Sequence, residues 1–390
     1  MSYESDVYEV PWNSDRWELA LLERPNISFL GGPGRWVLFR PARVIVSTRA
    51  LEDSRIREAV RRAGAEGCDE PDAEVAKTLG LELLLAPEGR EVELVREIER
   101  LVPCSASLDH VQLPGPHRVH GDDDPVPAAD PGDITGRGVA GEGLSVLVLD
   151  TGGVPRPALR LHVDPADEEI VDEDHDELRD PAAGHGTHVA GIIARLAPAA
   201  DIVAHRLLKS PVGEASDLEV AAALLDHGGA DIINCSFGEM TLDDVAPLCI
   251  QNALAALPAS TVVVAAAGNG GVERRNWPAA FERVIAVGAV GRPKNTGDWL
   301  QTDFSNYGSW VDCCAPGVAI VSTFLTLPAE GFPSGYASWT GTSMASPAVA
   351  GTIAALATKE NAGLAQAVAE VRGQTQLGTV GALVDPVALI

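Results

Sequence analysis

Three residues in this chain have the types and the surroundings that nucleophilic catalysis needs. Asp150 ends the apolar run LSVLVLD, His185 lies in GHGTHVAG, and Ser343 lies in GTSMASPAVAG. A serine hydroxyl is a weak nucleophile near neutral pH and needs a base within hydrogen-bond reach, which imidazole can supply. The chain order Asp, His, Ser is one of the known orders of a hydrolytic triad. We therefore expect Asp150 to orient His185, His185 to act as general base and then acid, and Ser343 to attack.

Each of these residues also has a structural interpretation when it is taken alone. Asp150 suits a helix cap or a turn, His185 a buried core position, and Ser343 an N-cap. Their combination in this order favours catalysis. We expect His188, the second histidine of HGTH, to be structural, since no zinc-ligand pattern accompanies it. The six cysteines lack the CxxC spacing of a zinc site. In a cytoplasmic protein we expect them to be six reduced thiols.

The elements that would position these residues alternate in type. Apolar strands are expected at 144–150, 200–208, 230–237, 260–268 and 283–290, and helices at 185–196, 218–228 and 343–359. This alternation predicts an α/β fold, a three-layer, doubly wound and mostly parallel sheet with helices on both faces. In such sheets the active site lies at the carboxyl ends of the strands, where Asp150 is expected. We assign residues 135–390 to this catalytic domain.

The residues before this domain predict a second, smaller α+β unit with the bounds 36–112. Its strands are expected at 43–47, 80–86 and 105–113 and its helices at 51–64 and 91–102, an order typical of a ferredoxin-like fold. Residues 1–35, which carry Trp12 and Trp17, form an N-terminal arm that is either pinned onto the fold or partly disordered. The segment 113–134 is rich in Pro, Gly and Asp and is expected to be an exposed linker.

The charge of the chain argues against several partners. Asp and Glu outnumber Lys and Arg by 56 to 29, a net charge of −27, and 35 of these acids against 14 basic residues follow residue 120. Such a surface repels phosphate backbones and anionic membranes, so we expect neither nucleic acid nor a membrane as a partner. The first thirty residues have no basic start and no apolar core, which predicts a cytoplasmic protein. A wrongly assigned start site would instead hide a signal peptide and make the protein secreted.

The three motifs, with their order and surroundings, resemble the subtilisin-like serine proteases (the subtilase family, peptidase family S8) over residues 143–390. AAAGNGG is similar to the segment that carries the family's oxyanion asparagine, here Asn269, and INCSFG to its substrate-pairing strand. The resemblance implies a serine endopeptidase in which Asn269 and the Ser343 backbone N–H bind the oxyanion. The sedolisins, which use a glutamate base and an oxyanion aspartate, fit less well because His185 and Asn269 are present here.

The resemblance also implies a peptide or protein substrate that pairs as an added strand. The residues expected to contact it are Ser236, Phe237, Gly238, Ala266, Ala267, Gly268 and Asn276. Asn276 falls where the family has the floor of the first specificity pocket, and its amide favours a partly polar preference. No cofactor is required. There is no room after 185–196 for the long calcium-binding loop of many secreted members, while segment 164–180, with ten acids in seventeen residues, is either a cation site or a solvated loop.

The N-terminal unit resembles the family's propeptide (inhibitor I9-like) domain in pattern. This implies that 36–112 assists folding, acts as an intramolecular inhibitor and is cut near 113–122, and an accessory domain that stays attached is the alternative. We expect a protease that is held latent and is selective in processing. The other class of function is a catalytically idle subtilase fold that binds peptides, although the triad and the oxyanion asparagine are all present.

Overall fold

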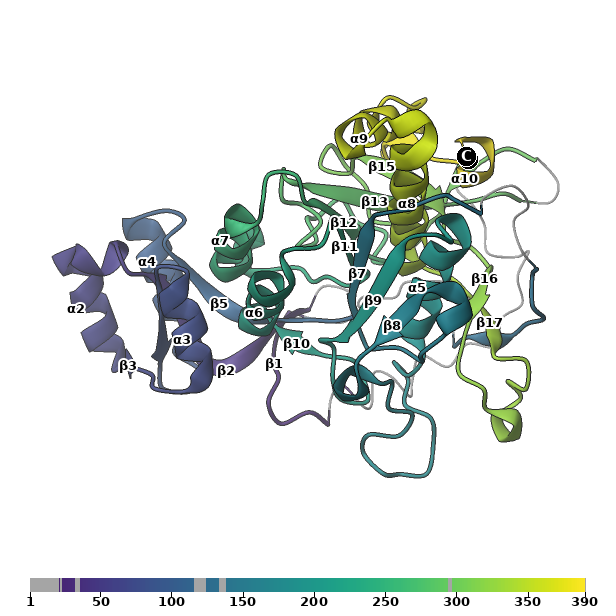
Figure 1. The fold of residues 1–390 in the computed structure, drawn as a ribbon. Helices are drawn as coiled ribbons and strands as arrows, with labels where there is room; N and C mark the ends of the chain where they lie inside the picture. The colour runs from purple at the N-terminus through teal and green to yellow at the C-terminus, as the bar shows by residue number, and fades with distance from the viewer. Residues whose placement is uncertain are drawn as a thin grey trace.

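A nine-stranded sheet forms the centre of the larger domain within the described residues (Figure 1). The computed structural model describes residue 21 and residues 23–31, 36–115, 124–132, 138–293 and 297–389. The sheet has the order β18-β15-β13-β12-β11-β7-β9-β8 with parallel neighbours, and β14 pairs antiparallel with β13. Its strands are β7 (Ser145–Asp150), β8 (Leu161–Val163), β9 (Asp201–Arg206), β11 (Ile232–Cys235), β12 (Val262–Ala266), β13 (Val284–Gly291), β14 (Leu300–Gln301), β15 (Cys313–Pro316) and β18 (Ala382–Leu383). The predicted doubly wound, mostly parallel sheet is confirmed.

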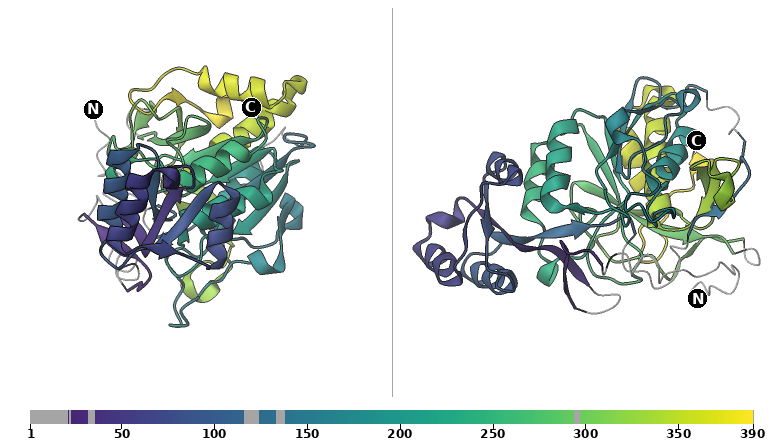
Figure 2. Two further views of the ribbon diagram at one scale, coloured as in Figure 1. Left: turned by 90° about the vertical axis from the view of Figure 1, so that its left-hand side faces the viewer. Right: turned by 90° about the horizontal axis from the view of Figure 1, so that it is seen from below.

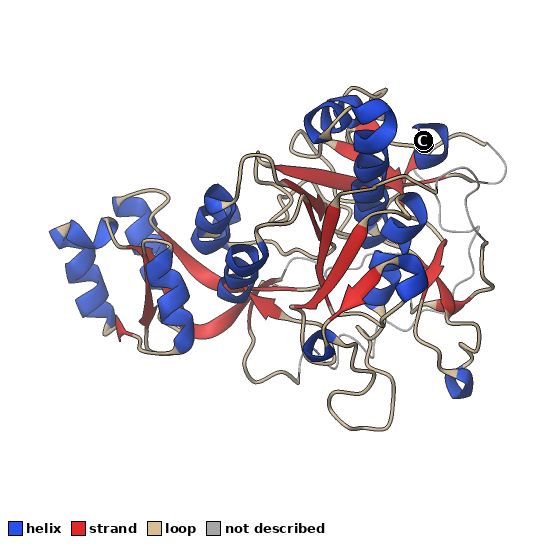
Figure 3. Ribbon diagram, viewed as in Figure 1, coloured by secondary structure: helices blue, strands red, loops and turns tan. Residues whose placement is uncertain are grey.

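Helices cover both faces of this sheet (Figure 3). Because side chains alternate along a strand, β7 places Val148 in one apolar core and Leu149 in the other. The first core contains residues of α5 (His185–Leu196), α8 (Thr342–Thr358) and α9 (Leu364–Arg372), and the second those of α6 (Asp217–His227) and α7 (Leu248–Ala256). Helices α5 and α8 approach closely at Gly351, where a Cβ would lie 2.9 Å from the Cβ of Leu196.

A three-stranded sheet lies beside α5 and consists of β16 (Ile320–Thr323), β17 (Tyr336–Trp339) and β6 (Val126–Pro127). The short helices of this domain are η3 (Pro157–Leu159), η4 (Pro165–Asp167), η5 (Leu242–Asp244), η6 (Pro328–Glu330), η7 (Lys359–Asn361) and α10 (Pro386–Leu389). Over the part of the chain that the structure describes, no helix is long and apolar enough to cross a membrane.

The N-terminal unit is an antiparallel sheet with helices packed against it. Its strands are β1 (Ser28–Leu30), β2 (Val37–Ser47), β3 (Glu66–Gly67), β4 (Leu81–Leu85) and β5 (Ala106–Gln112), in the order β5-β2-β4-β3 with β1 also on β2. After the short η2 (Ala50–Glu52), α2 (Ser54–Ala63) packs with α4 (Glu91–Leu101) on one face of the sheet through Ile56 and Ile98. The predicted ferredoxin-like order is confirmed.

One helix of this unit, α3 (Pro71–Thr78), was not predicted from the sequence. Its buried residues are Ala73 and Ala76, which join the apolar core that contains α6 and α7, and not the core of α2 and α4. Two alanines make a weak apolar stripe, so the helical period is hard to detect. Pro71 at the start of the helix was the available signal.

The N-terminal unit docks on α6 and α7 at one end of the molecule (Figure 2). Ile45 of β2 and Leu83 of β4 share an apolar cluster with Leu218 and Leu224 of α6. A short strand of the larger domain, β10 (Ala215–Ser216), pairs antiparallel with β5 and so extends the N-terminal sheet. The two domains therefore share one core and one sheet.

The segment 113–134, which we expected to be an exposed linker, is buried at its start, whereas most of its described residues from 126 to 132 are exposed. Residues 113–115 are buried, because Leu113 continues the line of β5 and pairs with Gly238. Near its other end, Val126–Pro127 is strand β6 and pairs with β17. Residues 116–123 and 133–137 lie outside the described residues, as do Trp12 and Trp17 of the arm.

Candidate active site

Asp150 and His185 form a buried hydrogen-bonded pair at the carboxyl end of β7. Asp150 is the last residue of β7 and His185 the first of α5, and they are 0% and 1% exposed. Asp150 Oδ1 accepts from His185 Nδ1 at 2.7 Å and from the Thr151 backbone N–H at 2.8 Å. Because Nδ1 faces a carboxylate it carries the proton, and Nε2 is the ring nitrogen that can act as a base.

A tryptophan ring packs against both histidines of HGTH. The Trp339 ring meets His185 edge-to-face with centroids 5.3 Å apart, and His188 in the same manner at 5.8 Å. His188 Nε2 donates to the carbonyls of Ile320 and Ala337 at 3.1 and 3.2 Å, and burial lowers the pKa of His188 to about 3. A neutral histidine that ties two strands together suits the structural role expected for it.

Ser343 lies in the first turn of α8, and Asn269 is anchored to the same turn. Ser343 Oγ donates to Ser236 O at 3.0 Å. Asn269 Oδ1 accepts from the backbone N–H and the hydroxyl of Thr342, both at 2.9 Å. Two donors on Oδ1 fix the orientation of the amide and put the donor atom Nδ2 on its other side. An amide donor and the N-terminus of a helix thus accompany the serine, which is the equipment needed to bind an oxyanion.

Polar side chains join β11 to α8 behind the serine. Ser236 Oγ donates to Ser343 O at 2.9 Å and accepts from Asn234 Nδ2 at 2.9 Å, while Ser346 Oγ donates to Asn234 Oδ1 at 2.8 Å. All four residues are buried, so each bond satisfies groups that water does not reach. Asn234 was not singled out from the sequence, although a polar residue inside the apolar strand INCSF was the signal.

Asn276 lies between Gly238, which we expected to pair with the substrate backbone, and Gly268, which we expected to line the first specificity pocket. A Cβ on Gly238 would lie 2.1 Å from Asn276 Nδ2, and one on Gly268 would lie 3.1 Å from Asn276 Cγ. Asn276 Nδ2 donates to Ala266 O at 3.3 Å, and the side chain is buried. The structure therefore brings these four residues together, with an amide group between them.

Two further residues expected to contact substrate are buried. Phe237 places its side chain in the core of α6 and α7, so a peptide would meet its backbone. Ala267 is buried as well, and its carbonyl accepts from Asn306 Nδ2 at 2.8 Å. Asn306 Oδ1 also accepts from the Gly270 N–H at 3.0 Å. Asn306 thus holds the loop that carries Asn269 from both sides and was not predicted from the sequence.

Glu169 ties the end of β7 to the start of α5 and was also missed. Its Oε1 accepts from Thr151 Oγ1 at 2.6 Å and from the Gly184 N–H at 2.9 Å. Its Oε2 accepts from Thr187 Oγ1 at 2.8 Å and from the Thr187 N–H at 3.3 Å. Burial raises the pKa of Glu169, and these hydrogen bonds offset part of the rise. Since Glu169 is one of ten acids in its segment, composition could not single it out.

The end of β5 brings the N-terminal unit into the site. The Gly238 N–H donates to Leu113 O at 3.1 Å in an antiparallel bridge, and Gln112 pairs with Ala215 of β10. Pro114 follows, close enough to Gly213 that a Cβ there would lie 3.1 Å from Pro114 Cγ. The N-terminal unit therefore occupies the backbone of Gly238, which we expected to pair with a substrate peptide.

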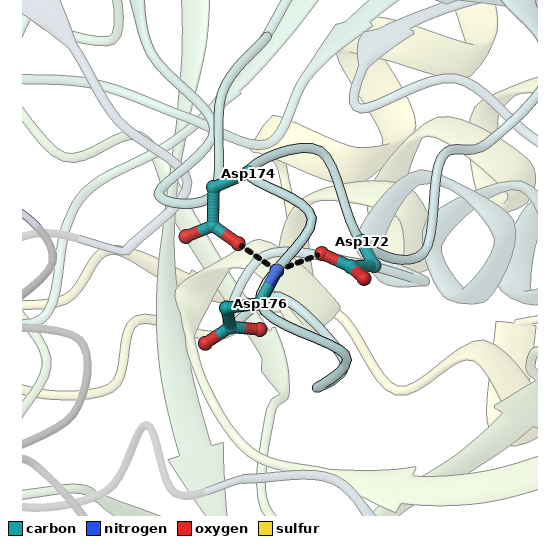
Figure 4. A group of neighbouring side chains, drawn as sticks. All are labelled: Asp172, Asp174 and Asp176. Carbon is teal, nitrogen blue, oxygen red and sulfur yellow. Dashed lines mark hydrogen bonds between the residues drawn. The ribbon is translucent and has the colours of Figure 1, made fainter.

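One group of three carboxylates among the described residues lies close enough to share a metal ion (Figure 4). Oxygens of Asp172, Asp174 and Asp176 lie within 4.8 Å of one another. The Asp176 backbone N–H donates to Oδ1 of Asp172 at 3.1 Å and of Asp174 at 3.2 Å, so both carboxylates also hold their own loop. The two alternatives stated from the sequence, a cation site and a solvated acidic loop, are both compatible with this geometry.

The family comparison covers the domain that carries this site. The model of the subtilase family (Peptidase S8) matches residues 141–375, and the chain belongs to the subtilase family. The resemblance noted from the motifs is confirmed. The residues before 141, including the ferredoxin-like unit, lie outside this match.

Curated relatives of this chain are named as proteases. The thermophilic serine proteinase of Bacillus sp. (strain AK1) is 41% identical over 230 residues, 56% of this chain and 53% of the relative. The M-protease of Shouchella clausii (strain KSM-K16) is 34% identical over 58% of this chain and 56% of the relative, and Subtilisin Savinase of Lederbergia lenta is 34% identical over 58% and 80%. The chain thus spans about half the length of the first two relatives.

Solved structures share the fold. Fervidolysin from Fervidobacterium pennivorans, described as a keratinolytic enzyme related to subtilisin, matches 90% of this chain and 61% of its own, with a TM-score of 0.57 and 21% identity. A protease from Pseudoalteromonas arctica matches 65% of this chain and 90% of its own, with a TM-score of 0.53 and 26% identity. The first of these likenesses extends over both domains.

Proposed function

We propose that this chain is a serine endopeptidase that works through an acyl-enzyme intermediate. Ser343 Oγ attacks the peptide carbonyl while His185 Nε2 takes its proton, and Asp150 holds the imidazole and stabilises its protonated form. Asn269 Nδ2 and the Ser343 backbone N–H bind the oxyanion. His185 then protonates the leaving amine, and water repeats the sequence to release the acyl group. Each step uses protein groups and water.

The observation that carries this proposal is the 2.7 Å hydrogen bond between Asp150 and His185 in a chain of the subtilase family. A buried carboxylate is costly unless it is paired, so the pairing keeps both groups in one arrangement. The anchoring of Asn269 Oδ1 by Thr342 supports the oxyanion role, because it fixes which end of the amide donates. The relatives at 34–41% identity are named as proteases or proteinases.

We propose further that the N-terminal unit holds the enzyme latent and confines it to selective processing. The Gly238 N–H that would pair with a substrate backbone already donates to Leu113 O, so a peptide must displace this segment. The core that β2, β4 and α3 share with α6 makes this displacement more difficult. Cleavage near 113–122 is the proposed route of release.

Intact-mass analysis with a fluorophosphonate probe tests both parts. Wild type is compared with Ser343→Ala and with Ser334→Ala, an exposed serine that serves as the matched control. We expect wild type and Ser334→Ala to gain one label at Ser343 and to split near 113–122. Ser343→Ala is expected to stay whole and unlabelled.

The other outcomes separate the alternatives. A wild-type chain that stays whole but labels at Ser343 would be an active protease with a permanent accessory domain. Absence of labelling, in a protein whose folding is verified by circular dichroism and after the chain is cut between residues 116 and 123, would contradict the protease proposal. The idle, peptide-binding fold would then be the better description.

A further inference from the structure

The carboxylate of Asp217, the first residue of α6, receives hydrogen bonds from β5 of the N-terminal unit. Gln112 Nε2 donates to Oδ1 at 2.6 Å, and His110 donates to Oδ2 through its backbone N–H at 3.1 Å and through Nδ1 at 2.8 Å. His110 Nε2 accepts from the Leu242 N–H at 3.2 Å, so the ring is neutral with its proton on Nδ1. Asp217, His110 and Gln112 are each at most 1% exposed. A dry carboxylate of the catalytic domain is thus satisfied by a segment that the proposed activation removes.

A second carboxylate on the other side of β10 is held in the same way. The Glu214 side chain is 4% exposed. It accepts from Asn26 Nδ2 at 2.8 Å, from Arg40 Nη1 at 2.9 Å and from Arg24 Nη2 at 3.1 Å. These donors also belong to the chain before residue 113. Strand β10 is therefore flanked by two carboxylates that depend on donors from the N-terminal unit.

The register of β5 relates Gln112 to the bond that Ser343 would cut. Leu113 bridges Gly238 antiparallel, and two residues back along that segment Ser236 O accepts from Ser343 Oγ at 3.0 Å. Consider an extended substrate peptide with one residue opposite Gly238, where Leu113 now lies. Because the pairing is antiparallel, the substrate residue two positions later lies opposite Ser236, and the scissile bond follows that residue. In this register Gln112 stands at the fourth position before the scissile bond.

We propose that Asp217 makes the peptide groove selective for substrates whose fourth residue before the scissile bond donates hydrogen bonds, most strongly Arg or Lys. This inference rests on the proposed function and adds the class of substrate to it. When the N-terminal unit leaves, Asp217 and Glu214 lose these donors and become open to water. A bound peptide covers Asp217 again, and burying a carboxylate without a donor is costly. A cationic side chain restores the hydrogen bond and balances the charge, Leu only fills the space, and Glu is repelled.

The test uses the full chain and four fluorogenic peptides that are identical except at the fourth position before the cut bond. That position carries Arg, Gln, Leu or Glu. We expect kcat/KM to fall in this order, with Arg at least about tenfold above Leu, as suits a charge-assisted hydrogen bond in a dry site. In Asp217→Asn the ratio of Arg to Leu is expected to drop to about threefold or less. Asp226→Asn makes the same change at the exposed far end of α6 and is expected to keep the wild-type ratio.

A second measurement uses the chain's own segment as the occupant of the groove. Gln112→Glu places a negative charge beside the Asp217 carboxylate and weakens binding of the N-terminal unit, so we expect fluorophosphonate labelling of Ser343 to be about tenfold faster. Gln112→Arg strengthens this contact and is expected to slow the labelling. In the Asp217→Asn background the two variants are expected to differ little. Each peptide ratio is measured within one protein, so partial misfolding of a variant does not imitate it. For the Gln112 variants, unchanged circular dichroism excludes misfolding as the cause of a changed labelling rate.

The outcomes separate this inference from the proposed function. If Ser343 labels and all four peptides are cut at equal rates, or the wild-type and Asp217→Asn ratios agree, the inference is wrong and the protease proposal stands. If Ser343 neither labels nor supports hydrolysis in any variant, the proposed function fails and the inference fails with it.

Discussion

The Glu169 carboxylate accepts a 2.6 Å hydrogen bond from the hydroxyl of Thr151, the residue that follows Asp150. That hydroxyl accepts from the Gly186 N–H at 2.9 Å, so its own proton points at Glu169. The hydroxyl of Thr187 has the same arrangement. It accepts from the Val154 backbone N–H and donates its own proton to Glu169. With two backbone N–H groups in addition, Glu169 receives four donors, which favours its ionised form. Burial acts against these donors and on balance raises the pKa of Glu169. In its ionised form Glu169 is a second negative charge beside the start of α5.

Glu169→Gln tests whether this charge positions His185 and stabilises its protonated form. In the variant, the amide N–H groups of the glutamine face the groups that donate hydrogen bonds to Glu169 in the wild type. The negative charge of the carboxylate is lost. We expect kcat/KM to fall about tenfold and the acid limb of its pH profile to move to lower pH, because a protonated imidazole is less favoured. Glu168→Gln, at an exposed neighbouring acid, is the control. A lower rate with an unmoved acid limb would reduce Glu169 to a structural role.

Asp109 predicts a pH dependence of the contact between the two domains. Burial raises the pKa of Asp109 from 3.8 to about 6, and the neighbouring Asp217 carboxylate adds to the rise while Arg43 opposes it. Since the folded-state pKa is above the unfolded value, the folded chain binds more protons between about pH 4 and pH 6. The contribution of Asp109 to stability is therefore present at low pH and is lost as the pH rises through 6.

Asp109→Asn removes this titration while it keeps an acceptor for the Leu218 N–H, which lies 3.2 Å from Asp109 Oδ1. We expect the variant to match its parent at pH 4 and to be about 1–3 kcal/mol more stable at pH 8. Denaturant unfolding in the Ser343→Ala background avoids self-cleavage, and Asp226→Asn controls for the change in net charge. An equal stability difference at both pH values would contradict the prediction.

The role proposed for Asn269 predicts a loss in kcat and not in KM. Asn269→Leu keeps the size of the side chain and removes the donor, so we expect kcat to fall about 10²–10³-fold, the size known for the corresponding donor of a subtilisin. Thr342→Val removes one of the two bonds that hold Asn269 Oδ1 and leaves the donor in place. Its kcat is expected to fall less than about tenfold. Equal losses in the two variants would assign Asn269 to folding.

Asn276 predicts the size preference of the first specificity pocket. Its buried amide fills the space above Gly238 and Gly268. We compare kcat/KM for a substrate with a large apolar residue before the scissile bond with kcat/KM for a substrate with alanine at that position. Asn276→Ala is expected to raise this ratio about tenfold, because the emptied space can bury more apolar surface of the substrate. Arg275→Ala changes the exposed neighbour and should leave the ratio unchanged. A constant ratio in Asn276→Ala would place the pocket elsewhere.

The sequence by itself determined the elements that carry the chemistry. The motif GHGTHVAG predicts a helix over 185–196, and α5 has these bounds. The run LSVLVLD predicts a strand that ends at Asp150, as β7 does. Such predictions succeed because strand and helix periods, capping residues and the polar residue at a strand end are all local in the chain. The parallel order of the sheet follows from the same alternation of elements.

Only the tertiary structure decided which residues from distant parts of the chain contact these elements. Gln112 and Asp217 are 105 positions apart and bond at 2.6 Å, and Leu113 pairs with Gly238 across the same contact. A hydrogen bond between distant residues imposes no period on the sequence, so the segment after β5 had the composition of an exposed linker although its first residues are buried. Glu169 was hidden for the same physical reason, since four donors from two elements distinguish it from its nine acidic neighbours only once the chain has folded.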